Sequence, residues 1–109
     1  MMSNGDHPNV VLIWQGDGHA HVSLEEVLDM AMTHAAFGQT VCVWLCADSV
    51  QTVITQPQLN DKLTLLSEMG MNVFCDQSQH LPTAAPTVRP VPVTLRQQLI
   101  SHASHSFTF

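Results

Sequence analysis

One stretch decides the fold: Asn9-Val10-Val11-Leu12-Ile13-Trp14, in which five apolar residues follow one another without a polar interruption. A strand with one solvated face alternates apolar and polar residues, whereas a strand buried on both faces reads as a continuous apolar run. Strands of the second kind are typical of parallel sheets with helices on both sides. The run therefore predicts a central strand of such a sheet.

The residues after this run predict a loop and then a helix. Residues 15–21 are polar and contain two glycines. Ser23 and Glu26 form a capping box, in which the serine caps the first turn and the glutamate reaches back to it. Gly38 is placed to end the helix. The apolar positions at helical spacing between them are Leu24, Val27, Leu28, Ala31 and Ala35. Strand, loop and capped helix open a βαβ unit.

The same alternation continues to the end of the chain. Residues 40–46 and 71–74 are further apolar strands, separated by an amphipathic helix that we expect to be capped by Asn60 and closed by Gly70. Later, a proline-rich segment leads to a second capping box, at residues 94–97, and then to a last helix. The final strand is expected at 106–109, with period-two alternation. The order predicts a single α/β domain over residues 1–109, a three-layer α/β/α arrangement around a mostly parallel sheet of about five strands.

Charge excludes two classes of partner. The net charge is −6, and the only fixed cations are Lys62, Arg89 and Arg96. Phosphate backbones and anionic membrane surfaces both require clusters of lysine or arginine, so we expect no direct nucleic-acid binding and no membrane association.

Neither a leader nor an apolar run of membrane-spanning length is evident. The three cysteines, an odd number, indicate thiols in a reducing compartment, and we expect the cytoplasm.

Cys75 is the candidate reactive residue. It lies where the strand at 71–74 meets polar residues, and in open α/β sheets chemistry gathers at the carboxyl ends of strands. A helix starting near Ser78 would lower the pKa of the thiol, Asp76 would raise it by charge repulsion, and His80 could become cationic nearby. The alternative is a buried cysteine that packs as a small apolar side chain.

The other two cysteines have weaker claims. Cys42 and Cys46 are four residues apart on one strand, which separates them by roughly 13 Å and rules out a shared zinc ion or a disulfide. Cys42 is expected in the core. Cys46 lies at the carboxyl end of its strand, and it could approach Cys75 if the two strands are neighbours.

The loop after the first strand is the best place for a metal. Asp17, His19 and His21 offer a carboxylate and two imidazoles, although an exposed polar loop explains them more simply. The loop would also border the Cys75 site. Gly16-Asp17-Gly18 lacks the third glycine of a dinucleotide fingerprint, and no P-loop is present, so we expect no cofactor.

In order and spacing, the chain resembles the DsrE/DsrF-like proteins, especially their TusC/DsrF branch. Residues 21–31 resemble that branch's first helix, and the Val-Trp-Leu-Cys-Ala-Asp-Ser-Val run at 43–50 resembles its second strand and turn. Cys75 matches the position of the family's cysteine. Residues 95–99 and 106–109 resemble its last helix and its closing strand. The likeness lies in the whole sequence of elements rather than in any single motif.

This resemblance implies a subunit of a sulfur-relay complex of the TusBCD or DsrEFH type. Such complexes pass cysteine persulfides between proteins, toward thiolation of the tRNA wobble uridine or within sulfur oxidation. The chain would be a sulfur carrier through Cys75 or a structural partner. It would form hetero- or homo-oligomers with homologous subunits and meet sulfur donor and acceptor proteins. The alternative is a structural or regulatory α/β module without sulfur chemistry, with or without a metal in the histidine loop.

Overall fold

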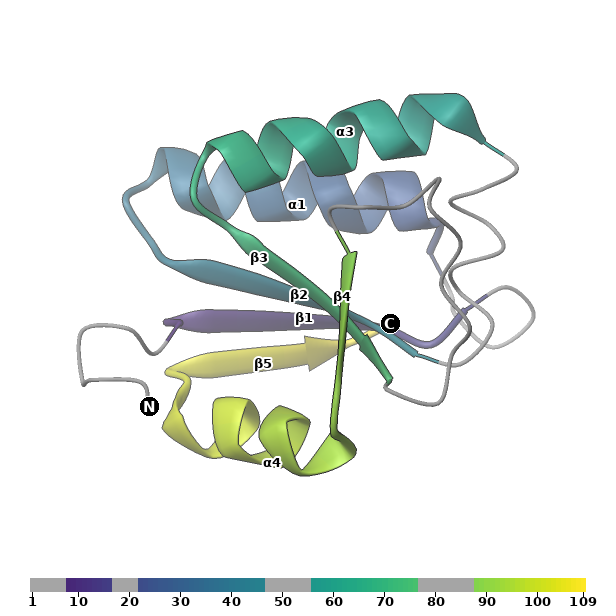
Figure 1. Cartoon of the computed structure of the whole chain (residues 1–109). Helices are drawn as coiled ribbons and strands as arrows, with labels where there is room; N and C mark the ends of the chain where they lie inside the picture. The colour runs from purple at the N-terminus through teal and green to yellow at the C-terminus, as the bar shows by residue number, and fades with distance from the viewer. Residues whose placement is uncertain (1–7, 17–21, 47–55, 77–87) are drawn as a thin grey trace.

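A five-stranded sheet forms the centre of the protein. The structure, a computed structural model, describes residues 8–16, 22–46, 56–76 and 88–109. Every strand pair in it is parallel, and the strand order is β4-β3-β2-β1-β5 (Figure 1). The strands are β1 (Val10–Trp14), β2 (Val41–Leu45), β3 (Asn72–Asp76), β4 (Val88–Val91) and β5 (His105–Thr108). The predicted α/β fold is confirmed.

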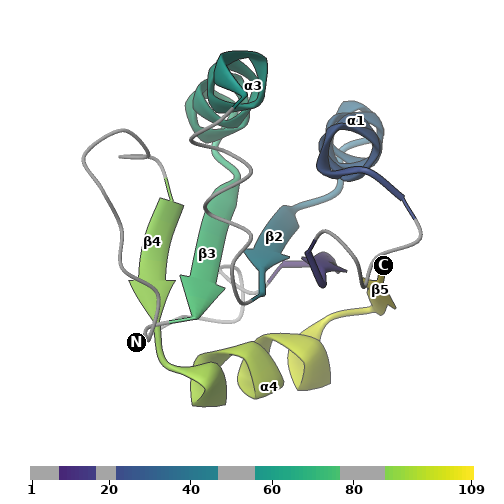
Figure 2. The same cartoon turned by 90° about the vertical axis from the view of Figure 1, so that its right-hand side faces the viewer.

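Helices cover both faces of this sheet. The helices α1 (Leu24–Ala36) and α3 (Pro57–Glu68) lie side by side on one face, and α4 (Val93–His102) crosses the other (Figure 1 and Figure 2). Successive residues of a strand point to opposite faces, so each strand contributes to two separate cores. In β1 the alternate residues from Val10 to Trp14 pack toward α1 and α3, while Val11 and Ile13 pack toward α4. All five are buried, which explains the run without polar residues.

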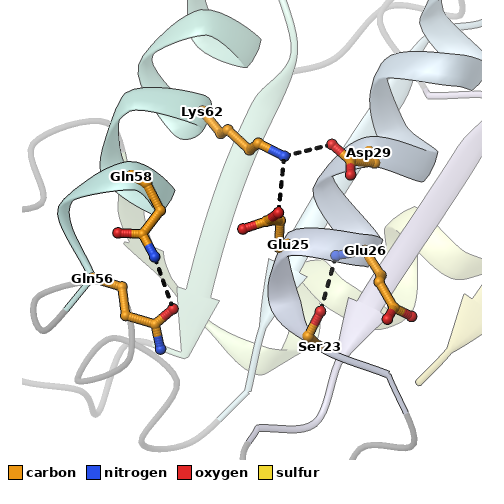
Figure 3. A network of polar contacts seen from close by, with 7 residues as sticks. All are labelled: Ser23, Glu25, Glu26, Asp29, Gln56, Gln58 and Lys62. Carbon is orange, nitrogen blue, oxygen red and sulfur yellow. Dashed lines mark hydrogen bonds and ion pairs between the residues drawn. The ribbon is translucent and has the colours of Figure 1, made fainter.

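The predicted signals at three helix ends are confirmed, except that the Glu26 side chain makes no hydrogen bond back to Ser23 among the described contacts. The Ser23 hydroxyl accepts a hydrogen bond from the backbone N–H of Glu26 at 3.2 Å (Figure 3). Gly38, just beyond α1, has φ +85°, and Gly70, just beyond α3, has φ +87°. Glycine adopts this left-handed conformation without the steric penalty that other residues carry, so both positions end their helices.

Two predicted helix caps are wrong. The helix α3 begins at Pro57, and Asn60 lies inside it rather than before it. Proline suits the first turn because the N–H that it lacks would have no partner within the helix, and this places the start one turn earlier. The helix α4 begins at Val93 after Pro92, and no side chain in the described part of the chain caps it, so Thr94 does not act as its cap.

The strand β4 was not anticipated from the sequence. It contains Pro90, and a proline inside a run argues against a central strand because it cannot donate a ladder hydrogen bond. The sheet accommodates it because β4 is an edge strand, which among the described residues pairs only with β3. The strand β5 forms the other edge, where it pairs with β1. Within the described residues, no helix has the length and apolar character needed to cross a membrane.

Lys62 of α3 links the two helices that share a face. Its Nζ donates a hydrogen bond to Asp29 Oδ1 at 2.7 Å and lies 3.7 Å from Glu25 Oε1 (Figure 3). All three side chains are partly exposed, and ion pairs of this kind contribute little to stability. The contact joins α3 to α1 at the surface, while the buried leucines beneath it supply the packing.

Two leucines of α3 provide a matched test of this packing. Leu63 is 0% exposed beneath the helix, and Leu65 is 42% exposed on its outer side. We expect Leu63→Ala to lower the free energy of unfolding by about 2–5 kcal/mol, because it leaves a cavity in the core. The same change at Leu65 is expected to lower it by less than about 1 kcal/mol. Urea unfolding followed by circular dichroism measures both, and equal losses would contradict the placement of α3.

Candidate functional site: the carboxyl ends of β2 and β3

Two cysteines lie at the carboxyl ends of neighbouring strands. The strands β2 and β3 pair in parallel, with Leu45 opposite Cys75. Cys46 follows Leu45 directly and continues the pairing of β2 with β1, since its backbone N–H donates to the carbonyl of Trp14 at 2.9 Å. The condition for Cys46 and Cys75 to approach one another, that their strands are neighbours, is therefore met.

The sheet nevertheless separates the two thiols. Cys75 belongs to the core beneath α1 and α3, together with Leu45. Cys46 packs against the core beneath α4, together with Cys42 and Trp44. Cys46 and Leu45 are consecutive in the chain, and consecutive residues of an extended strand face opposite sides. The two cysteines thus reach the same edge of the sheet on opposite faces.

Cys75 is packed as a small apolar side chain. It is 0% exposed. Burial and, to a smaller extent, the negative charge of Asp76 together raise the pKa of its thiol to about 11. The repulsion expected from Asp76 is present, and the thiol is protonated at neutral pH. Sulfur transfer through Cys75 stays a prediction, and it requires the packing around this thiol to open.

Cys42 lies in the core between the sheet and α4. It is 1% exposed, and burial raises its pKa to about 12 although the charge of Arg89 acts in the opposite direction. The expectation that Cys42 is a core residue is confirmed.

Cys46 has a different environment. It is half-buried, and the Arg96 guanidinium donates a hydrogen bond from Nη1 to its Sγ at 3.3 Å. Burial is the largest influence on the thiol and raises its pKa. The positive charge of Arg96 lowers this pKa, the negative charge of Asp76 raises it, and the hydrogen bond from Arg96 also lowers it. Among the three cysteines, Cys46 is the one that an arginine contacts directly and the one that is not fully buried.

Asp76 and Trp44 hold Arg96 in place beside this thiol. Asp76 Oδ1 accepts a hydrogen bond from the Trp44 indole Nε1 at 2.8 Å and lies 3.8 Å from Arg96 Nη1. The Arg96 guanidinium also lies over the Trp44 ring, 5.7 Å from its centroid. These side chains come from β2, β3 and the first turn of α4. We call Trp44, Cys46, Asp76 and Arg96 the β2–β3 edge cluster.

Sequence reasoning found two members of the edge cluster and missed the roles of the others. The sequence predicts Cys46 and Asp76 near the site, but it identifies Arg96 only as a cation and as part of a helix start. No local pattern places Arg96 beside Cys46, fifty residues away in the chain. The contact exists because the unanticipated β4 delivers the start of α4 to the carboxyl edge of the sheet (Figure 2).

Several predicted site residues lie outside the described residues. These are Asp17, His19, His21, Ser78 and His80. Both the metal-loop alternative and the helix near Ser78 therefore stay predictions. Within the described ranges, no group of three or more His, Cys, Asp or Glu side chains is arranged to hold a metal ion.

A groove of about 1200 Å³ lies beside α4 on the same face of the sheet. Its walls include Cys42, Phe74, Arg89 and His102. Arg89 lies over the Phe74 ring, 5.1 Å from its centroid, and donates to Asn72 Oδ1 at 2.7 Å. Neither Cys46 nor Cys75 is among the described residues that line it, so the groove and the edge cluster are separate features.

Comparison with solved structures shows the fold. The YchN protein from E. coli superposes with a TM-score of 0.76 at 18% identity, covering 94% of this chain and 99% of YchN. A conserved protein of unknown function from Bacteroides thetaiotaomicron, BT1422, superposes with a TM-score of 0.69 at 14% identity, covering 93% and 95%. No protein-family model and no curated protein matches the sequence. YchN has a DsrE/DsrF-like fold, so the fold implied by the sequence resemblance is supported over nearly the whole chain.

The raised pKa of Cys75 predicts a loss of stability in alkali. Between the ordinary value of 9.0 and the folded value of about 11, the unfolded chain loses the proton that the folded chain keeps. The unfolded state then binds fewer protons, so the free energy of unfolding falls as pH rises through this window and is unaffected below it. The contribution of Cys75 is on the order of 2 kcal/mol.

Cys75→Ala isolates this contribution. The variant lacks the thiol but keeps Cys42, Cys46 and Lys62, which also titrate in alkali. We expect its unfolding free energy, measured by urea titration at a series of pH values, to decline less steeply than that of the wild type above pH 9.0. Parallel curves for the two proteins would show that the Cys75 thiol is not perturbed by burial.

Proposed function

We propose that this chain is a subunit of a sulfur-relay assembly of the DsrE/DsrF type, which hands persulfide sulfur from one protein to the next. The finer assignment follows the sequence resemblance: the TusC/DsrF branch, acting in the cytoplasm toward tRNA wobble-uridine thiolation or in sulfur oxidation. The partners would be homologous small α/β subunits together with sulfur donor and acceptor proteins.

The observation that carries this proposal is the position of the thiols within the fold. The chain combines a DsrE/DsrF-like fold with cysteines at the carboxyl ends of two adjacent parallel strands. That edge of an open α/β sheet is where ligands dock, because the loops there leave a crevice beyond the strands. A relay requires a thiol that a partner's persulfide can approach, and this edge is suited to it.

The burial of Cys75 divides the possible roles. A persulfide carrier needs an accessible thiolate, whereas Cys75 is fully enclosed and its pKa is raised. In the isolated chain, Cys75 therefore supports the structural-partner role that the family resemblance also allows. A carrier role at Cys75 would depend on a partner subunit that opens the contacts beneath α1 and α3.

The surface favours association with other subunits. Only 11% of the residues are charged, well below the usual quarter, so much of the surface is neutral. Phe37, at the end of α1, is 82% exposed, and aromatic side chains of this kind are enriched where protein partners meet. The alternative is a structural or regulatory module without sulfur chemistry. One observation favours it, namely the burial of Cys42 and Cys75.

Sulfur transfer and assembly can be tested in parallel. Incubation with a cysteine desulfurase loaded with persulfide is expected to add the mass of a sulfur atom to the intact protein, and dithiothreitol should remove it. A desulfurase deprived of its cysteine substrate is the control. In the second arm, native mass spectrometry of the chain mixed with homologous relay subunits is expected to show mixed oligomers.

The outcomes separate the roles. Added sulfur supports the carrier role, and a mixed oligomer without added sulfur supports the structural role. A chain that remains a monomer in every mixture and takes no sulfur would refute membership of a relay and leave the structural or regulatory module.

A further inference from the structure

We propose that Cys46, held beside Arg96 in the β2–β3 edge cluster, is the thiol of this chain that accepts sulfane sulfur. This inference rests on the proposed relay function but assigns the reaction to a different residue from the one that the family resemblance indicates. The substrate class is a persulfide or polysulfide, in which the outer sulfur is the electrophile.

The contact with Arg96 favours a sulfur anion at Cys46 and opposes the effects of burial and of Asp76. Arg96 points a guanidinium N–H at the Sγ from 3.3 Å, and a hydrogen bond from a charged donor to an anion is stronger than one between neutral groups. Asp76 and the Trp44 ring restrain the same guanidinium. Arg96 therefore meets the sulfur from a fixed position and needs no large rearrangement when charge develops there.

The alternatives on this chain are less suited. Cys42 and Cys75 are 1% and 0% exposed, and neither receives a hydrogen bond from a cation among the contacts of the described residues. Cys46 is half-buried at the end of its strand, so part of its side chain is exposed before either core is unpacked. Partial burial also protects a bound persulfide from bulk solvent.

The reaction is a thiol–persulfide exchange without net oxidation. The Cys46 thiolate attacks the outer sulfur of the donor R–S–S–H, a bond forms between Cys46 Sγ and that sulfur, and the S–S bond of the donor breaks. The products are Cys46–S–S–H and the donor thiolate R–S⁻. The proton that the Cys46 thiol loses beforehand passes to solvent, and the reverse exchange delivers the sulfur to the next thiolate.

Arg96 is a positioning residue in this step. It stabilises the attacking thiolate, and later the persulfide anion that forms when Cys46–S–S–H releases its proton to solvent. The charged groups that the structure describes around Cys46 are Arg96 from α4 and Asp76 from β3, which act on the sulfur in opposite directions. Loss of Arg96 leaves Asp76 without its counter-charge and disfavours both sulfur anions.

Inorganic polysulfide is a direct probe of this assignment. After exposure at neutral pH and alkylation, peptide mass spectrometry is expected to find the added sulfur on the peptide that contains Cys46. Cys46→Ser should abolish the modification, and Cys75→Ser should leave it unchanged. Each variant carries all of residues 1–109, and circular dichroism verifies that it is folded.

The two arginines of the α4 face provide the matched control. Both lie over aromatic rings, Arg96 over Trp44 and Arg89 over Phe74, but only Arg96 donates to the Cys46 thiol. Arg96→Gln should slow sulfur uptake at neutral pH by about tenfold, the effect of one hydrogen bond to a charged group. It should also move the pH dependence of the rate to higher pH. Arg89→Gln should change neither, and Arg96→Lys should restore part of the rate.

Each result bears on the assignment. Sulfur on Cys75 and not on Cys46 would overturn it while leaving the relay function intact. Uptake at Cys46 with equal rates and pH profiles for Arg96→Gln and Arg89→Gln would overturn the role of Arg96. Absence of sulfur on every cysteine, with the persulfide-loaded desulfurase as well as with polysulfide, would refute the carrier function itself.

Discussion

The structure depends on one constraint: the central strands are apolar on both faces, so both faces must be covered. β1 and β2 are buried at every position, and no single layer of helices can achieve this. The chain satisfies the constraint with α1 and α3 on one side and α4 on the other (Figure 2). To reach the second side it returns through β4, and this return brings α4 and Arg96 to the carboxyl edge.

The same constraint distributes the cysteines. Alternation along β2 and β3 places Cys75 beneath the two-helix layer and Cys46 on the α4 side, although both lie at one edge of the sheet. The two-helix layer seals Cys75 completely, and burial keeps it protonated. On the other side α4 is the covering helix, and it carries the cation Arg96. Cys46 lies one residue beyond Leu45, the partner of Cys75 in the sheet. This shift of one position leaves Cys75 enclosed and Cys46 partly exposed.

Much of the fold follows from the sequence, because its signals are local. Apolar runs identified the first three strands, and Ser23, Gly38 and Gly70 marked helix ends through a side-chain cap and two left-handed glycines. The predicted caps at Asn60 and Thr94 are wrong because residue types that cap helices also occur inside them. Pro57 marks the actual start of α3. β4 carries Pro90, which obscures a strand unless its edge position is known. The Arg96–Cys46 contact depends on that topology, so no local pattern could reveal it.

The central claim is that the two faces of the sheet give the strand-end thiols different chemistry. The most direct measurement is an NMR titration of protein labelled with carbon-13 at the cysteine Cβ, which reports the ionisation of each thiol separately. The account predicts that Cys46 ionises at lower pH than Cys75, whose pKa is about 11, and Cys42, whose pKa is about 12. Ionisation of Cys75 before Cys46 would contradict it.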